Sequence, residues 1–249
     1  MVSPGGSEAS RPRLWLAVPR GAGGDLERLF APVSQDAAAT PPAVRPDCLV
    51  VDATGGDDPG SGAAPVLLAA SDGAGRRLGG LLRSARPGGA EPVAVFERLG
   101  QLRGTELAVR CESSRSAAAV VDAARVAGLL ERLWVLSPAL GLLEEVRSGS
   151  PATRLLHECD PAREPRGSER HAAVLRSTGI EGVMVRHDRA SAGLAALLGR
   201  FGRLMAASGA EYPRMVRAAV RAGVQIVSGP DAAVLAQGLG PEPGDTSPG

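Results

Sequence analysis

Short apolar runs alternate with longer amphipathic stretches along most of the chain. Nine of these runs are about five residues long and apolar throughout, which is typical of parallel strands covered on both faces. We predict a β-strand at each run: residues 14–18, 48–52, 66–70, 107–111, 133–136, 153–157, 182–186, 204–207 and 224–228.

The stretches between the later runs have the periodicity of helices that bury one face. In residues 116–127, for example, Ala119, Val120 and Ala123 share one face, while the charged residues lie elsewhere. Similar patterns predict helices over residues 139–147, 169–177, 190–201 and 212–222. Glycines stand at positions 128, 179, 202 and 223, just past helix ends, where a left-handed residue commonly ends a helix.

This alternation predicts an α/β fold in which the parallel strands form a (β/α)₈ TIM barrel. Nine strands are one more than such a barrel needs, so we expect one short strand outside it. Residues 55–102 have a poor pattern and are expected to form an insertion over one end of the barrel. We predict that residues 1–12 and 240–249 are disordered tails and that residues 13–239 form one folded domain.

Composition narrows the possible functions mainly by exclusion. The 249 residues carry 28 basic and 27 acidic side chains, and a net charge of +1 gives no electrostatic case for nucleic-acid binding. Cys48, Cys111 and Cys159 are widely spaced, which suggests buried thiols in a reducing compartment. The longest apolar run near the start is too short for a membrane span or a signal peptide. We therefore expect a cytoplasmic protein without a membrane span.

Several segments stand in an order that matches a known enzyme family. They are Leu-Ala-Val-Arg-Cys-Glu at 107–112, Ala-Gly-Leu-Leu at 127–130, Trp-Val-Leu-Ser at 134–137 and Gly-Val-Gln-Ile-Val-Ser-Gly-Pro-Asp at 223–231. Together they resemble the glycerophosphodiester phosphodiesterase family over residues 105–239, and the first half of the chain is similar in outline. The resemblance implies a TIM barrel of the phospholipase-C-like phosphodiesterase type. It also implies a phosphoric diester hydrolase of lipid metabolism.

The positions that carry the family's chemistry are substituted in this chain. Family members use two histidines for acid–base catalysis, and the matching residues are Pro19 and Ser71, which exchange no proton near neutral pH. Two glutamates and an aspartate hold a divalent cation in the family, and the matching residues are Val50, Asp52 and Arg110. We therefore expect no catalytic residue here, no cation or other cofactor, and an impaired or absent phosphodiesterase activity.

Arginines suggest what the mouth of such a barrel would bind instead. The resemblance places Arg20 where a guanidinium grips phosphate, and Arg110 ends another predicted strand. With Asp52 and Asp72, they predict a site for a small phosphate-containing ligand. The alternative is that each arginine forms a structural ion pair with Asp52, Asp72 or Glu112. Two functions stay open: an impaired phosphodiesterase, and a non-catalytic barrel that binds a phosphate-containing ligand or a protein partner.

Two further groups have chemically suggestive residue types. His187 and Asp188 could form a general base with its carboxylate, but adjacent side chains rarely point the same way, so we expect a solvated loop pair. Ser137 and Ser228 end predicted strands and are candidate hydrogen-bond donors at the mouth.

The third group has the residue types of zinc ligands. His157 and Cys159 stand close together and His171 follows them, but no second cysteine has a suitable spacing. We therefore expect no metal site in this region, and Glu158 and Asp160 to be ordinary loop acids.

Overall fold

A computed structural model describes residues 12–17, 48–54, 66–69, 96–97 and 106–239. All nine predicted strands are present within these ranges, and they form one sheet. The strands are β1 (Arg13–Ala17), β2 (Cys48–Thr54), β3 (Val66–Ala69), β4 (Glu106–Arg110), β5 (Leu133–Ser137), β6 (Arg154–Glu158), β7 (Gly182–Arg186), β8 (Leu204–Ser208) and β9 (Ile226–Gly229).

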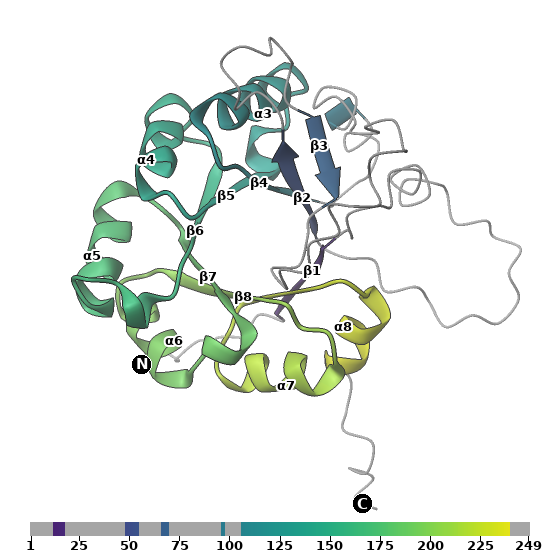
Figure 1. The fold of residues 1–249 in the computed structure, drawn as a ribbon, viewed down its shortest axis with the longest axis vertical. Coiled ribbons are helices and arrows are strands. Elements are labelled where there is room, and N and C mark those ends of the chain that lie inside the picture. The colour runs from purple at the N-terminus through teal and green to yellow at the C-terminus, as the bar shows by residue number, and fades with distance from the viewer. Residues whose placement is uncertain (1–11, 18–47, 55–65, 70–95, 98–105, 240–249) are drawn as a thin grey trace, which may run out of the picture.

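Parallel pairing curls this sheet back on itself (Figure 1). The order is β1-β9-β8-β7-β6-β5-β4-β2-β3, and β1 also pairs with β2. Trp15 is thus the register partner of Ser228 on one side and of Cys48 on the other. β3 pairs antiparallel with β2 alone. It is the extra strand that the sequence predicts.

Helices pack around the outside of the curled sheet (Figure 1). They are α3 (Ser114–Val126), α4 (Leu140–Gly149), α5 (Ser168–Thr178), α6 (Ala192–Arg200), α7 (Pro213–Arg221) and α8 (Ala232–Leu239). The predicted helices agree with α3 to α7, and α8 was not predicted. The four predicted glycine ends are also present: for instance, Gly179 caps α5 with a φ of 74°, in the left-handed region.

Strand and helix therefore alternate regularly from β4 onward. The segments after β1 and β3 lie mostly outside the described residues, as do the predicted tails and most of the predicted insertion. No helix in the described part of the chain is long and apolar enough to cross a membrane.

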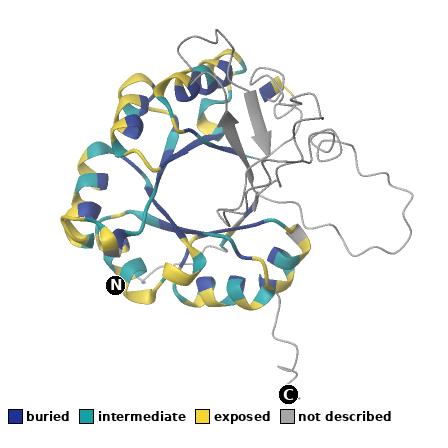
Figure 2. Ribbon diagram, in the orientation of Figure 1, coloured by how far each residue is buried: buried dark blue, intermediate teal, exposed yellow. Residues whose placement is uncertain are grey.

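Two apolar layers explain why the strands are apolar throughout. One layer fills the space enclosed by the strands and contains Trp15, Ala108, Trp134, Leu136, Leu156, Met184, Ala206 and Ile226. The other layer lies between strands and helices, and it includes Leu155 of β6 and Leu175 of α5. Because successive side chains of a strand point to opposite faces, each strand serves both layers. Figure 2 shows the result as buried strands with buried inner faces on the helices.

The amino end of the strands is held by a charged cluster around Glu106. Its carboxylate accepts hydrogen bonds from Trp134 Nε1 at 2.6 Å, Arg13 at 3.0 Å and Arg154 at 2.5 Å. The Arg154 guanidinium also lies over the Trp134 ring, 5.3 Å from its centroid. One carboxylate thus connects β4 to three other strands at the amino end of the curled sheet.

Replacing Glu106 should destabilise the fold. Glu106→Ala leaves a buried indole N–H and two guanidiniums without their acceptor, so we expect a loss of about 2–3 kcal/mol in the free energy of unfolding. Urea unfolding followed by tryptophan fluorescence measures it. The control is Glu112→Ala at an exposed position, which should cost at most about 0.5 kcal/mol. Equal losses in the two variants would contradict the role given to Glu106.

Candidate functional site

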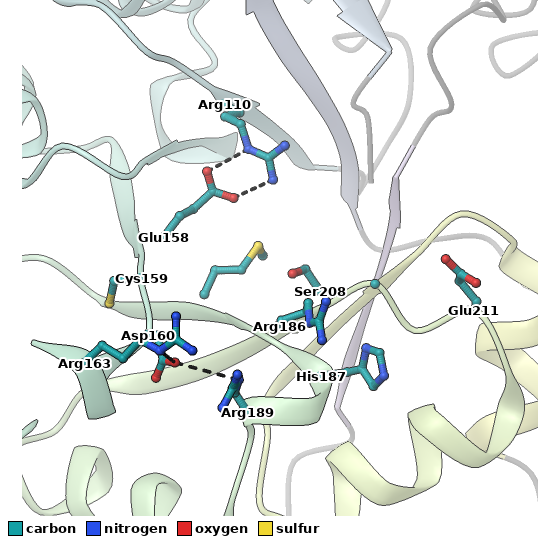
Figure 3. Close-up of a pocket in the computed structure, with 12 residues that line it drawn as sticks. Arg110, Glu158, Cys159, Asp160, Arg163, Arg186, His187, Arg189, Ser208 and Glu211 are labelled. Atoms are coloured by element: carbon teal, nitrogen blue, oxygen red, sulfur yellow. Dashed lines mark hydrogen bonds and ion pairs between the residues drawn. The ribbon is translucent and has the colours of Figure 1, made fainter. Parts of the chain in front are cut away.

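A pocket of about 550 Å³ opens at the carboxyl ends of β4, β6, β7 and β8 (Figure 3). In α/β folds built on parallel strands, active sites commonly lie at this end of the strands. Charged side chains dominate its lining: the arginines are Arg110, Arg163, Arg186 and Arg189, and the acids are Glu158, Asp160 and Glu211. The pocket is therefore suited to a polar, charged ligand.

The innermost charges form a fork-to-fork ion pair across two strand ends. Arg110, the last residue of β4, donates from Nε and Nη2 to the carboxylate of Glu158, the last residue of β6, at 2.7 and 2.6 Å. Only 21% and 15% of these side chains are exposed. Bidentate pairs of this kind are strong and directional, so each group holds the other's orientation.

This pair revises two predictions from the sequence. Arg110 does form an ion pair, as the second interpretation holds, and its described partner is Glu158, an acid that the sequence did not suggest for this role. Glu158 is consequently no ordinary loop acid: it ends a strand and points into the mouth (Figure 3).

The backbone also places Asp52 at the same level along the strands as Arg110. Asp52 of β2 is the register partner of Arg110, so the two predicted ligand-binding residues stand side by side on neighbouring strands. Arg20 and Asp72, with Pro19 and Ser71, lie outside the described residues. Two of the four predicted ligand-binding residues are thus located by the structure.

The outer charges of the pocket form exposed pairs. Arg186 binds the carboxylate of Asp188, and this bond is the main reason that the pKa of Asp188 falls to about 2. Asp160 lies 3.4 Å from Arg163 and 3.8 Å from Arg189. Exposed pairs of this kind contribute little to stability, so these arginines can exchange a carboxylate for another anion at small cost.

His187 lines the pocket without the carboxylate that a general base would use. Asp188 turns to Arg186 instead, which agrees with the prediction of a loop pair. The Nδ1 atom of His187 is buried, and it has no hydrogen-bond partner among the residues described.

The serines at strand ends have local roles. Ser137 is fully buried, and its Oγ accepts a hydrogen bond from the Ala139 N–H at 3.1 Å, at the entry to α4. Ser228 is also buried, and its carbonyl accepts from the Ala210 N–H. Neither lines the described pocket.

A second cluster lies behind the pocket wall, between β6 and α5. His157, Cys159, Glu164 and His171 bring one nitrogen, sulfur or oxygen atom each to within 4.8 Å of one another. Burial is the largest cause that raises the pKa of Cys159 to about 12, followed by three neighbouring carboxylates. The sequence alone predicts no metal site in this region, and the presence of an ion is not tested by the structure. What the structure adds is that the β6–α5 connection brings these four residues together.

The fold is that of known phosphodiesterases. A glycerophosphodiester phosphodiesterase from Parabacteroides distasonis superposes with a TM-score of 0.67 at 11% identity, over 92% of this chain and 98% of its own. One from Agrobacterium tumefaciens gives 0.58 at 11% identity, over 90% and 99%. A phosphodiesterase from Oleispira antarctica in complex with the product sn-glycerol-3-phosphate gives 0.60 at 13% identity, over 91% and 96%. No protein-family model matches the chain, and no curated protein does.

At this level of identity the comparisons define a fold class. The chain has the α/β fold of the glycerophosphodiester phosphodiesterases, with parallel strands curled around a common centre.

The Arg110–Glu158 pair should be energetically coupled. In a double-mutant cycle with Arg110→Met and Glu158→Gln, we expect a coupling energy of about 1–3 kcal/mol in urea unfolding, because the pair is bidentate and mostly buried. The matched cycle uses Arg186→Met and Asp188→Asn, whose side chains are 66% and 38% exposed, and should give about 0.5 kcal/mol or less. Equal coupling in both cycles would contradict a special role for the inner pair.

Proposed function

We propose that the protein is a divergent member of the glycerophosphodiester phosphodiesterase family, with a complete (β/α)₈ barrel, whose mouth binds a small phosphate-containing ligand without efficient hydrolysis. The fold shared with six solved phosphodiesterase structures supports the family. The sn-glycerol-3-phosphate held by the Oleispira antarctica protein supports the ligand class. The observation that carries the proposal is Arg110 at the mouth, held by Glu158.

Arg110 argues against the family's cation in this chain. By resemblance it occupies the position of a metal-binding carboxylate, and it brings a fixed positive charge instead. Hard cations such as Ca²⁺ and Mg²⁺ require about six oxygen ligands, and a guanidinium supplies none. In Glu158, the acid beside it, both carboxylate oxygens already accept hydrogen bonds from Arg110. Among the described residues, the donors beside Arg110 therefore do not fit such a cation.

The remaining arginines favour a phosphate group as the ligand. Arg163, Arg186 and Arg189 surround the same pocket in exposed pairs, and a guanidinium binds phosphate oxygens in the same bidentate way as it binds a carboxylate. A phosphate monoester carries more negative charge than one carboxylate, so it can displace an exposed acid from its arginine. Arg20 is the further contact that the resemblance suggests.

The described part of this mouth has few side chains that could transfer a proton during cleavage. Cleavage of a phosphodiester requires a base for the attacking group and an acid for the leaving group. The positions that resemble the family's two histidines hold Pro19 and Ser71. Within the described lining of the pocket, His187 is the one imidazole. Binding is thus better supported than turnover.

Binding is measured by calorimetric titration of the full chain with glycerol 3-phosphate and glycerophosphocholine. Arg110→Ala should weaken binding by roughly 10- to 150-fold, because a desolvated bond to phosphate contributes about 1.5–3 kcal/mol. Arg186→Ala, on the exposed rim, should weaken it less. Arg200→Ala, at an exposed position outside the pocket lining, is the control and should bind as the unmodified protein does.

Hydrolysis is assayed in parallel with added Mg²⁺, Ca²⁺ or Mn²⁺. We expect no metal-dependent turnover. Turnover that disappears in Asp52→Ala would show an active enzyme and overturn the non-catalytic part of the proposal. If neither ligand binds at millimolar concentration, the proposal of a phosphate-containing ligand is wrong. The arginines would then be structural ion-pair partners.

A further inference from the structure

The cluster of His157, Cys159, Glu164 and His171 lies where one strand passes into its helix. His157 and Cys159 are two positions apart at the end of β6, so their side chains point to the same side, away from the barrel interior that Leu156 occupies. Glu164 follows the short helix η2 (Pro161–Arg163), and His171 stands in α5. Four side chains from a strand, a loop and a helix therefore meet in the wall of the barrel.

Two distances in the cluster are close to those between ligand atoms around one metal ion. His171 Nε2 lies 3.2 Å from His157 Nδ1 and 3.6 Å from Cys159 Sγ. A tetrahedral Zn²⁺ with bonds of about 2.0–2.1 Å to nitrogen and about 2.3 Å to sulfur separates its ligand atoms by about 3.3–3.6 Å. Two edges of the tetrahedron are thus already present in the protein.

Neighbouring groups orient the two rings for this role. His157 Nε2 lies 3.0 Å from the carbonyl oxygen of Pro138. A carbonyl only accepts, so in the neutral ring Nε2 carries the proton and Nδ1 directs its lone pair at the cluster. Ligand histidines are typically held in this way by a backbone carbonyl or a carboxylate. In His171, Nδ1 lies 3.8 Å from a carboxylate oxygen of Glu164, and Nε2 faces His157 and Cys159.

Charge and access also suit a cation. Both histidines are 5% exposed, whereas Cys159 and Glu164 are partly exposed. One thiolate and one carboxylate would neutralise a divalent ion, which removes most of the cost of burying its charge. Cys159 also lines the mouth pocket, so the ion has a path from solvent.

We infer that His157 Nδ1, His171 Nε2, Cys159 Sγ and the Glu164 carboxylate form a zinc site that joins β6 to α5. Four protein ligands leave no open position, which is the pattern of a structural rather than a catalytic zinc. The loop between the ligands carries Asp160 and Arg163, two residues of the mouth pocket. Zinc at this site would therefore fix one side of the mouth. The inference does not depend on the proposed phosphate ligand.

A metal-free explanation of the cluster makes a different prediction. His171 Nε2–H can donate to His157 Nδ1 at the observed 3.2 Å, which satisfies both rings without an ion. In this explanation Cys159 Sγ, 3.6 Å from the same Nε2, is a further weak hydrogen-bond partner, and the Glu164 carboxylate lies 3.8 Å from the other nitrogen of the His171 ring, Nδ1. This explanation predicts no response of the protein to zinc.

Cobalt titration of the full chain, after dialysis against a chelator, tests the site directly. One equivalent of Co²⁺ should bind and produce the near-ultraviolet thiolate-to-cobalt band with the visible bands of tetrahedral cobalt, and Zn²⁺ should displace it. Cys159→Ala should remove the thiolate band, whereas Cys111→Ala, which alters a buried cysteine outside the cluster, should retain it. A band that survives in Cys159→Ala, or no stoichiometric binding, would overturn the inference.

Thermal unfolding supplies a second measurement that does not require a cysteine variant. At a free Zn²⁺ concentration 100-fold above its Kd, the Tm should rise by roughly 5–10 °C. Glu164→Gln, which changes a partly exposed side chain, should weaken zinc affinity by about 10- to 100-fold and leave the Tm of the metal-free protein nearly unchanged. His187→Ala, outside the cluster, should respond to zinc as the unmodified chain does. An unchanged Tm in the unmodified chain would favour the hydrogen-bonded histidine pair.

Discussion

The alternation of side chains along parallel strands is the constraint on which both sites depend. Each strand of the curled sheet is covered by the interior on one face and by helices on the other, so its residues must suit the two environments in turn. β6 shows the result: Leu155 faces the helices and Leu156 the interior. Past these, the same alternation sends Glu158 into the mouth toward Arg110, and His157 and Cys159 back toward α5.

Local patterns were sufficient to predict most of the fold. A strand covered on both faces is a short apolar run, and a helix on the outside has one apolar face, so neither prediction needs a distant partner. Even the surplus strand was expected, although the sequence could not say that β3 is the one that pairs antiparallel. The short α8 was missed, because it follows the last strand directly and its eight residues are mostly alanine, leucine and glycine.

The sites were less predictable, because their partners are distant in sequence. Glu158 stands 48 residues after Arg110, and only the strand order shows that their side chains meet across β5. Spacing alone argues against a metal site at His157, Cys159 and His171, since zinc patterns are usually recognised by paired cysteines. The available signal was subtler: His157 and Cys159 share one face of a strand end, and His171 lies in the helix that must pack on that face.

Under the proposed function, exchanging a cation for a guanidinium changes what the mouth can do. A divalent ion accepts oxygens from several directions and can polarise a bound water or phosphate oxygen. Arg110 offers a planar set of donors, and its bidentate bond to Glu158 fixes that plane. Such a group recognises the shape and charge of an anion, but it does not generate a nucleophile. A barrel mouth built in this way is therefore equipped to recognise a phosphate ester, and any cleavage would need proton-transfer groups from elsewhere in the chain.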